Sequence, residues 1–290
     1  MNTSVRAPLV SIGLPVFNGA RYLRQAVESA LNQTWTDFEL VISDNASTDE
    51  TPKLLAEFAA RDPRVKLLCQ PANRGVLTNS LDVLQQSRGE YFAFLAHDDY
   101  WAPEFLQAAM ELLCADQNLT SAFSQVQVVD EADRPKHLID LGFLDCRPPR
   151  SRFDAVLAYA RFGKDYHSYA VHRRSHTLAS VRHLESQHSY FQQNSRYCGG
   201  VFTHALVLDG AFAIVPKPLF YYRVHANSFS RIERPTPREL LFHLHYTLRC
   251  LAVYGQRAPA QFGLRRGGYI CYKLSKVHWR ALWRLAWATL

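Results

Sequence analysis

Two adjacent aspartates, Asp98 and Asp99, follow an apolar run at residues 91–96 that has the character of a buried strand. Neighbouring carboxylates at one strand end repel each other unless a positive group lies beside them. A divalent cation that also binds a diphosphate meets this need, because Mg²⁺ or Mn²⁺ is often held by one or two carboxylates together with phosphate oxygens. A solvated turn or a cap for the next helix is the alternative interpretation.

A third acid, Asp44, follows another strand-like run at residues 38–43. Its carboxylate only accepts hydrogen bonds, so it suits the N–H group of a base or the hydroxyl of a ribose. Residues 47–49 are typical N-cap residues for a helix that begins near Glu50, and capping explains part of this polar run. Asp44 lies too early in the run to be that cap.

The elements that position these acids alternate in period. Short apolar runs predict strands, and stretches with apolar residues on one helical face predict helices. This alternation predicts an α/β fold: a Rossmann-like, mostly parallel sheet with helices on both faces. Ligands of such sheets bind beyond the carboxyl ends of the strands, so Asn18, Asp44 and the acid pair should converge on one crevice. The expected strands are residues 10–14, 38–43, 65–69, 91–96 and 120–124, and the expected helices are residues 21–33, 50–60, 76–86 and 103–114.

The second half of the chain is less regular. From about residue 126 the rhythm weakens, and the histidine- and arginine-rich stretch 167–188 has no clean period. Alternation and apolar character return at residues 211–223. From residue 238 onward the pattern predicts helices, which are interrupted at residues 257–268.

Composition excludes several classes of protein. The chain has 290 residues, of which 48% are hydrophobic and 20% charged, a profile typical of a folded protein. The six cysteines form no C-x-x-C pair, which disfavours a zinc site, and we expect them to be reduced. We find no signal peptide and no apolar run of the roughly 18 residues that a membrane span needs. These features favour a cytoplasmic protein.

The net charge of +7 admits nucleic acid, anionic lipid or a phosphorylated ligand as a partner. No nucleic-acid-binding motif occurs, and acids at the strand ends would repel phosphate in the absence of a metal, so we expect no nucleic-acid partner. A dehydrogenase is disfavoured because no G-x-G-x-x-G sequence follows the first strand.

Four motifs in a fixed order resemble those of the family 2 inverting glycosyltransferases. They are VSIGLPVFNGARYL at residues 10–23, FELVISDNASTD at 38–49, NRG with Asn79 at 73–79, and RGEY leading to the acid pair at 88–99. A later segment, GAFAIVPKPLFYYRVH at 210–225, is similar to a family strand that ends in aromatic-aromatic-Arg-x-His. Each motif alone is a weak signal, but their order over the first third of the chain is specific.

The resemblance implies a glycosyltransferase-A fold, a nucleotide-diphosphate sugar as donor and a divalent metal, Mn²⁺ or Mg²⁺. Asp44 would bind the base, Asp98 would approach the ribose or sugar, and Asp99 would hold the metal. His225 would complete the metal shell or touch the diphosphate. The residues that we expect to bind the nucleotide sugar are Pro15, Val16, Asn18, Asp44, Arg74, Asn79, Asp98 and Arg223.

The chain departs from the family at the expected general base. Members usually carry a carboxylate shortly before the glycine that corresponds to Gly210, whereas residues 198–202 here read CGGVF. Inverting transfer needs a base to take the proton of the acceptor hydroxyl. Glu185 is our first candidate, followed by Asp165 and by His204. Asp98 is the other catalytic candidate, through its approach to the sugar.

A basic, tryptophan-rich pattern occupies residues 269–290. Its basic residues recur at helical spacing, and its apolar residues fall mostly on another side. Such a helix suits a membrane surface. Packing on its own domain or on a second protomer of a homo-oligomer is the alternative.

Together these features predict a metal-dependent inverting glycosyltransferase of bacterial-type surface polysaccharide synthesis. It would act on a glycan or lipid-linked acceptor, in the cytoplasm or peripherally on the inner face of the cell membrane. Residues 1–125 would bind the nucleotide sugar, residues 126–228 would form the acceptor-side half of the same domain, and residues 229–290 a C-terminal helical extension. The alternative is a catalytically inactive nucleotide-sugar-binding partner subunit of another transferase, which the missing carboxylate motivates.

Overall fold

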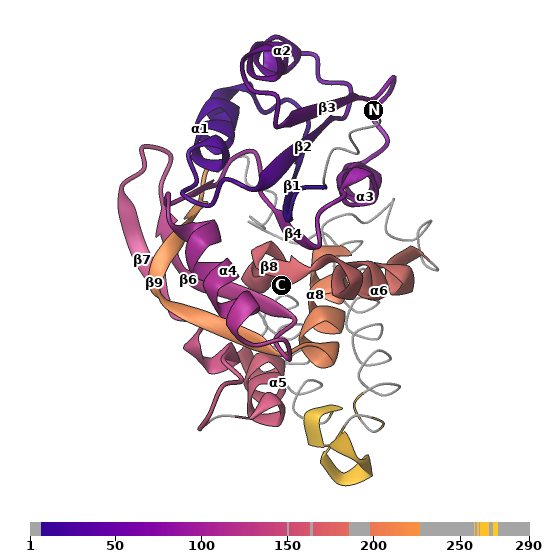
Figure 1. The fold of residues 1–290 in the computed structure, drawn as a ribbon, viewed down its shortest axis with the longest axis vertical. Helices are drawn as coiled ribbons and strands as arrows, with labels where there is room; N and C mark the ends of the chain where they lie inside the picture. Colours follow the sequence, from indigo (N-terminus) through magenta and orange to yellow (C-terminus); the bar gives the residue numbers. More distant parts are fainter. Residues whose placement is uncertain are drawn as a thin grey trace, which may run out of the picture.

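The structure is a computed structural model, and it describes residues 7–149, 151–162, 165–185, 198–226, 258, 260, 262–266 and 269–271. Within these residues a nine-stranded mixed sheet runs in the order β3-β2-β1-β4-β8-β6-β9-β5, and β7 pairs with β6. Figure 1 shows helices packed against this sheet on both sides. This arrangement confirms the predicted α/β class and the mostly parallel sheet.

The first half of the sheet follows the predicted alternation. Four parallel strands, β1 (Val10–Val16), β2 (Phe38–Asp44), β3 (Val65–Cys69) and β4 (Tyr91–Phe94), lie side by side in the order β3-β2-β1-β4. Helices α1 (Ala20–Leu31) and α2 (Thr51–Arg61) lie on one side of these strands, and α3 (Val76–Gln86) lies on the other (Figure 1). β2 is buried along its whole length, which explains the apolar residues Leu40–Ile42 at its centre, and its buried Glu39 is paired with Arg88.

The second half adds elements that the sequence did not predict. The strand β8 (Val171–Arg173) lies between β4 and β6 (Ser121–Val129) and is antiparallel to both. It is too short to show an alternating pattern, and this explains why residues 167–188 lack a clean period. That stretch instead holds β8, most of the short helix η2 (Asp165–Tyr169) and the helix α6 (Arg174–Glu185). The strand β7 (Pro135–Ile139) is mostly exposed, so it also lacked a signal.

Helices complete this half of the molecule. The helix α4 (Phe105–Ala115) packs on β6, and its first turn is held to the end of α1 by Gln33, whose Oε1 accepts a hydrogen bond from the Leu106 backbone N–H at 2.9 Å. Ser151 and Asp154 cap the first turn of α5, with a 2.6 Å hydrogen bond between their side chains. The remaining elements are η1 (Gly142–Leu144), α5 (Arg152–Phe162) and α8 (Cys198–Asp209).

The long strand β9 (Phe212–Arg223) carries the end of the chain's second half back to the acid pair. It is parallel to β6 and antiparallel to β5 (Tyr100–Trp101), where Tyr100 is paired with Tyr221. The rings of these two tyrosines stack with centroids 4.6 Å apart. Because β5 directly follows the acid pair, this pairing places the end of β9 beside Asp99.

Strands from both expected segments, residues 1–125 and 126–228, contribute to the one sheet; their boundaries stay predictions. Of the expected C-terminal extension, the described residues lie between 258 and 271. There Phe262 packs against Phe153 of α5 with ring centroids 5.8 Å apart, and Ile270 is fully buried. No helix among the described residues is long and apolar enough to cross a bilayer.

Candidate active site

The carboxyl ends of β1, β2 and β4 meet the end of β9 at one edge of the sheet. Val16 and Asp44, the last residues of β1 and β2, are paired in register. Asp98 and Asp99 follow β4 and precede β5, whose partner β9 ends at Arg223. The predicted convergence of strand ends is therefore present, although Arg223 reaches it from the opposite half of the sheet.

Asp99 is buried at the centre of this edge, with 1% of its surface exposed. Its Oδ1 accepts a hydrogen bond from the backbone N–H of Arg223 at 2.9 Å, whereas its buried Oδ2 has no hydrogen-bond partner. Burial, and then the negative charge of Asp98, raises the pKa of the Asp99 carboxyl well above its usual value. In the absence of a cation, burial therefore favours the protonated form of Asp99, and its Oδ2 is left without a hydrogen-bond partner.

Asp98 pairs with His225 across the same edge. Nε2 of His225 lies 2.9 Å from Oδ2 of Asp98, and both side chains are mostly buried. The ring of Tyr22, from α1, lies 5.1 Å from the His225 ring between centroids. The structure thus brings His225 to the acid pair and places it against Asp98, and a contact of His225 with metal or diphosphate stays a prediction.

The residues at this edge supply only some of the ligands that a divalent cation needs. Among the described residues, no group of three or more His, Cys, Asp or Glu side chains is arranged to hold a metal ion. With a cation in place, Asp99 would ionise, and its orphaned Oδ2 would supply one negatively charged oxygen. Mg²⁺ and Mn²⁺ sites often combine one or two carboxylates with phosphate oxygens and water, so the donor set suits a cation that arrives with a diphosphate.

Asp44 lies at the start of a loop that is held from both sides. It is 4% exposed, and its Oδ1 accepts a hydrogen bond from the Ser47 backbone N–H at 3.1 Å. The loop is tied to the end of β1 by Asn18, whose Oδ1 accepts from the Thr48 backbone N–H at 2.8 Å. Asn18 has a positive φ of 49°, a conformation that asparagine tolerates better than most residues. Its side-chain amide oxygen is thus used within the protein.

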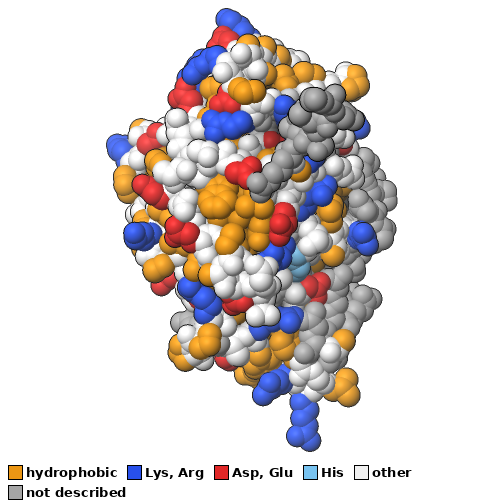
Figure 2. Space-filling view, in the orientation of Figure 1, with side chains coloured by type: hydrophobic (Ala, Val, Ile, Leu, Met, Phe, Trp, Pro, Cys, Tyr) orange, Lys and Arg blue, Asp and Glu red, His pale blue; other side chains and the backbone are white. Residues whose placement is uncertain are grey.

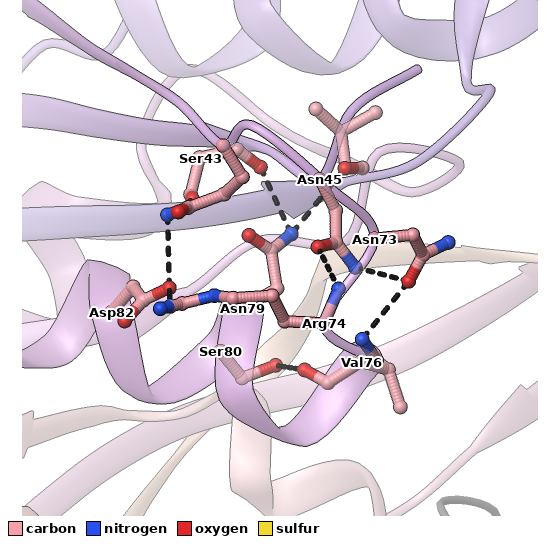
Figure 3. A network of polar contacts seen from close by, with 11 residues as sticks. Ser43, Asn45, Asn73, Arg74, Val76, Asn79, Ser80 and Asp82 are labelled. Atoms are coloured by element: carbon pink, nitrogen blue, oxygen red, sulfur yellow. Dashed lines mark hydrogen bonds and ion pairs between the residues drawn. The ribbon is translucent and has the colours of Figure 1, made fainter. Parts of the chain in front are cut away.

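A second loop meets the Asp44 loop through the amides in Figure 3. The Asn45 side chain donates to Oδ1 of Asn73 at 3.0 Å and accepts from the Arg74 backbone N–H at 2.8 Å. The guanidinium of Arg74 forms an ion pair with Asp82 of α3. Because Arg74 remains partly exposed, its guanidinium is accessible beside the loop that carries Asp44.

Asn79, by contrast, lies beneath the surface. It is 2% exposed, and its amide donates to the carbonyl of Ser43 at 2.9 Å and to that of Val16 at 3.3 Å. It therefore joins the ends of β1 and β2 (Figure 3). The Val16 carbonyl also accepts from the Asn45 backbone N–H at 2.9 Å, so this part of the expected nucleoside pocket is occupied by internal hydrogen bonds. Pro15, next to Val16, is partly exposed.

Arg223 is 1% exposed and lies between two aromatic rings. Its guanidinium carbon lies 4.4 Å from the centroid of Tyr22 and 5.3 Å from that of Tyr100. It donates to the backbone carbonyl of Asp98 at 2.7 Å and also bonds to Gln25 and Asp133. The sequence placed Arg223 among the residues expected to bind the nucleotide sugar, whereas in the structure its guanidinium is buried and bonds to the backbone of the acid pair.

Two side chains at this edge were missed by sequence reasoning. Phe17, directly after β1, is 42% exposed, and its aromatic face suits stacking on a planar base. His97 packs against Gly19, where a Cβ atom would lie only 2.5 Å from the imidazole Cδ2. An aromatic residue immediately after the first strand was the available signal for Phe17. No local pattern pointed to the His97 contact.

The three base candidates fall on described backbone, but their side chains lie outside the described part. Glu185 is the last residue of α6, Asp165 the first of η2, and His204 lies within α8. Residues 198–200, where the family carboxylate was expected, form the first turn of α8. That helix packs against α6 and η2, so the candidates belong to neighbouring elements.

A cleft of about 510 Å³ opens elsewhere, between α4 and the first part of β9. It is lined by Glu104, α4 residues, Arg147 and β9 residues. None of the residues predicted to bind donor or metal lines this cleft, so we do not assign it to the reaction.

Comparisons with known proteins agree with this geometry. The family described as "Glycosyl transferase family 2" matches residues 11–177. Chondroitin synthase of Escherichia coli is 36% identical over 141 residues, which cover 49% of this chain and 20% of the synthase. Hyaluronan synthase of Pasteurella multocida is 34% identical over 119 residues, which cover 41% of this chain and 12% of the synthase. The chain thus matches only a fifth or less of these two relatives.

Solved structures share the fold. The TarS 1–349 structure from S. aureus has a TM-score of 0.69 at 15% identity, covering 93% of this chain and 72% of that one. The mannosyltransferase PcManGT from Pyrobaculum calidifontis was solved with GDP-Man and Mn²⁺. It has a TM-score of 0.59 at 16% identity, and the match covers 98% of this chain and 74% of the mannosyltransferase. The matched region runs from β1 into α6 and includes the Asp44 loop and the acid pair, and on this evidence the chain belongs to glycosyl transferase family 2.

Proposed function

We propose that this protein transfers one sugar from a nucleotide-diphosphate sugar to a glycan or lipid-linked acceptor, with inversion at the anomeric carbon. The observation that carries this proposal is the buried Asp99 carboxylate, whose Oδ2 lacks a partner at the carboxyl edge of the sheet. A cation-bound diphosphate would supply the missing charge. Membership of glycosyl transferase family 2 supports the reaction class.

The donor would lie across the ends of β1 and β2. Asp44 accepts a hydrogen bond from the base, and the exposed ring of Phe17 stacks on it. Arg74 provides a positive charge near the nucleotide, on leaving or sharing its ion pair with Asp82. A TarS structure solved with UDP-GlcNAc and the P. calidifontis enzyme solved with GDP-Man support a nucleotide sugar as the donor class.

Asp99 is the residue that would hold the metal, and Asp98 with His225 would border it. A bound Mn²⁺ or Mg²⁺ stabilises the negative charge on the departing diphosphate. The P. calidifontis structure contains Mn²⁺, which supports this choice of cofactor. The Asp98–His225 contact keeps the Asp98 carboxylate oriented beside the sugar.

The acceptor would approach from the side of α6 and α8. There the chain must supply the base that takes the proton of the acceptor hydroxyl. Glu185, at the end of α6, stays our first candidate, followed by Asp165 and His204.

A partner at the membrane surface is a further part of this proposal. We place the protein in the cytoplasm, held peripherally at the inner face of the membrane by residues 269–290. Nearby described residues include the exposed Leu264, Arg265 and Arg266, and Tyr269 is 42% exposed. On the face in Figure 2, acidic and basic side chains are interspersed, which does not favour nucleic acid as a partner.

Liposome flotation tests the membrane assignment. Each basic residue near an anionic surface contributes about 1 kcal/mol, so the 290-residue chain should float with anionic vesicles and detach in high salt. A chain that ends near Gly268 should float less. Equal flotation of the two chains would favour packing of this segment on the protein itself.

Nucleotide-sugar binding and turnover test the reaction. A preferred donor should raise the melting temperature in the presence of Mn²⁺, because a ligand that binds only the folded state stabilises it. The same donor should then yield a glycosylated product of inverted configuration with a suitable acceptor. Donor binding without transfer or hydrolysis would favour the inactive partner subunit, and absence of nucleotide-sugar binding would reject both.

A further inference from the structure

The turn between β6 and β7, residues 130–134, is shaped by one of its own side chains. Oδ1 of Asp130 accepts hydrogen bonds from the backbone N–H groups of Ala132 at 2.9 Å and Arg134 at 3.0 Å. The Arg134 side chain also pairs with Asp130, at 2.8 Å. The turn therefore does not need its other two acids, Glu131 and Asp133, for its own hydrogen bonds.

Those two acids bond instead to α1 and to the end of β9. Glu131 pairs with Arg21 of α1 at 2.8 Å and accepts from the Ala226 backbone N–H at 3.0 Å. Asp133 accepts from the Gln25 side chain of α1 at 3.2 Å and pairs with the guanidinium of Arg223. The turn thus holds the end of β9 and the residues that follow it against α1, through contacts at Arg223 and at Ala226.

Asp133 is the more consequential of the two because its partner is buried. The Arg223 guanidinium is almost completely enclosed, and a charge in that setting requires a paired anion. Asp133 supplies a carboxylate in direct contact with it. Asp133 also has a positive φ of 62°, so the turn holds this residue in a conformation that few residue types adopt readily.

Arg223 in turn fixes both members of the acid pair. Its guanidinium donates to the Asp98 carbonyl at 2.7 Å, and its backbone N–H donates to the Asp99 carboxylate at 2.9 Å. Two residues later, His225 contacts the Asp98 carboxylate. A continuous series of contacts therefore leads from the turn, through Arg223, to the side chains that would meet metal and diphosphate.

We propose that Asp133 is a positioning residue for the acid pair, acting through Arg223 without contact with donor or metal. The inference rests on the proposed function, because positioning matters only if the acid pair binds a metal–diphosphate group. Groups that orient metal ligands typically contribute tenfold or more to metal affinity. A turn that served stability alone would leave this affinity unchanged.

The test compares Asp133→Ala and Asp133→Asn with a control in the same turn, Arg134→Ala. Asparagine keeps an oxygen that can accept from Arg223, whereas alanine removes it. Arg134 is mostly exposed and has no contact with Arg223 in the structure. Calorimetry measures UDP and GDP affinity over a Mn²⁺ titration, and a transfer assay separates KM from kcat.

We expect Asp133→Ala to weaken Mn²⁺-dependent nucleotide binding by roughly tenfold or more. Asp133→Asn should recover part of that loss, and Arg134→Ala should bind as the wild type does. If Asp133→Ala lowers only the melting temperature and keeps wild-type metal dependence, the turn is structural and the inference is wrong. If Asp133→Ala does not fold, the Asp133→Asn protein still decides the question, since an unchanged metal dependence there overturns the inference.

Hydrogen–deuterium exchange without ligand separates this inference from the proposed function. Backbone amides of residues 96–101 should exchange faster in Asp133→Ala than in Arg134→Ala, because Arg223 would no longer be held in place. Equal exchange in the two variants would overturn the positioning role whatever the protein catalyses. If the wild type shows no Mn²⁺-dependent nucleotide binding but the two variants still differ in exchange, the proposed function is rejected. The positioning of the acid pair by Asp133 through Arg223 is then retained.

Discussion

Two regions at the same edge of the sheet differ in how far their polar groups are satisfied. Around Asp44, the loops after β1, β2 and β3 are bound to one another by Asn18, Asn45 and Asn73. Around Asp99, a buried carboxylate oxygen has no partner, and a buried cation, Arg223, lies behind it rather than against it. In the first region the buried amide oxygen of Asn79 also lacks a partner, but it is uncharged, whereas the buried Asp99 carboxyl of the second region can bind a positive group from outside.

From this difference we expect the two regions to have separate roles in donor binding and in catalysis. A loop with satisfied hydrogen bonds keeps its shape before ligand arrives, so little ordering is required when the base binds. Burial raises the pKa of the Asp99 carboxyl, and a cation bound at the site would favour its ionised form. We therefore expect changes near Asp44 to affect mainly donor affinity, and changes near Asp99 to affect mainly metal use and turnover.

The largest effect is expected at Asp99. Replacing it by asparagine should lower kcat/KM by roughly a thousandfold, because metal stabilisation of a leaving diphosphate contributes several kcal/mol. The melting temperature without metal should not fall, since burial already favours the uncharged form of Asp99 and asparagine is uncharged as well. Steady-state kinetics over a Mn²⁺ titration and a thermal melt measure both. A fully active Asp99→Asn protein, or full wild-type activity in EDTA, would reject the metal assignment.

The next effect lies on the acceptor side, outside both regions. Glu185→Gln should reduce turnover by roughly a hundredfold, the usual size of a general-base contribution. Donor affinity should stay the same, because the base acts on the acceptor. Asp165→Asn and His204→Gln serve as matched comparisons under single-turnover conditions. Wild-type turnover in Glu185→Gln would move the assignment to the next candidate.

A smaller effect is expected at Asp44. Asparagine keeps an acceptor for the Ser47 N–H but loses the charge, and a hydrogen bond to a charged group is typically worth about 1.5–3 kcal/mol. Donor affinity should therefore fall by about tenfold or more, with kcat little changed. Asp37→Asn is the control, because Asp37 accepts from Leu9 at the opposite end of the sheet. An unchanged donor affinity in Asp44→Asn would remove Asp44 from the base site.

A substitution at Asn79 tests whether its buried hydrogen bonds stabilise the ends of β1 and β2 in the first region. Asn79→Ala removes the side-chain donor of the Ser43 carbonyl and one of the two donors of the Val16 carbonyl, and should lower the free energy of unfolding by about 1–3 kcal/mol. Urea denaturation of this variant beside Asn118→Ala, an exposed control, measures the loss. If stability is unchanged but donor affinity falls, Asn79 contacts the nucleotide, as the family resemblance implies.

Local patterns in the sequence were sufficient for the first half of the fold. The strands that end near Val16, Asp44 and Phe94 are apolar runs, and the intervening helices each present one apolar face. Such signals depend on residues a few positions apart, so a single sequence carries them. The acids follow these runs directly, and the sequence alone therefore placed Asp44 and Asp98–Asp99 at one edge.

Tertiary structure alone decided what surrounds the acid pair. Arg223 lies 125 positions from Asp98 and 90 from Asp133, and contacts over such separations leave no period in the sequence. The strand β8 has only three residues, so its place between β4 and β6 is set by pairing rather than by propensity. Burial of Arg223 between two tyrosines is likewise a product of packing, because a guanidinium's enclosure depends on which distant elements close over it.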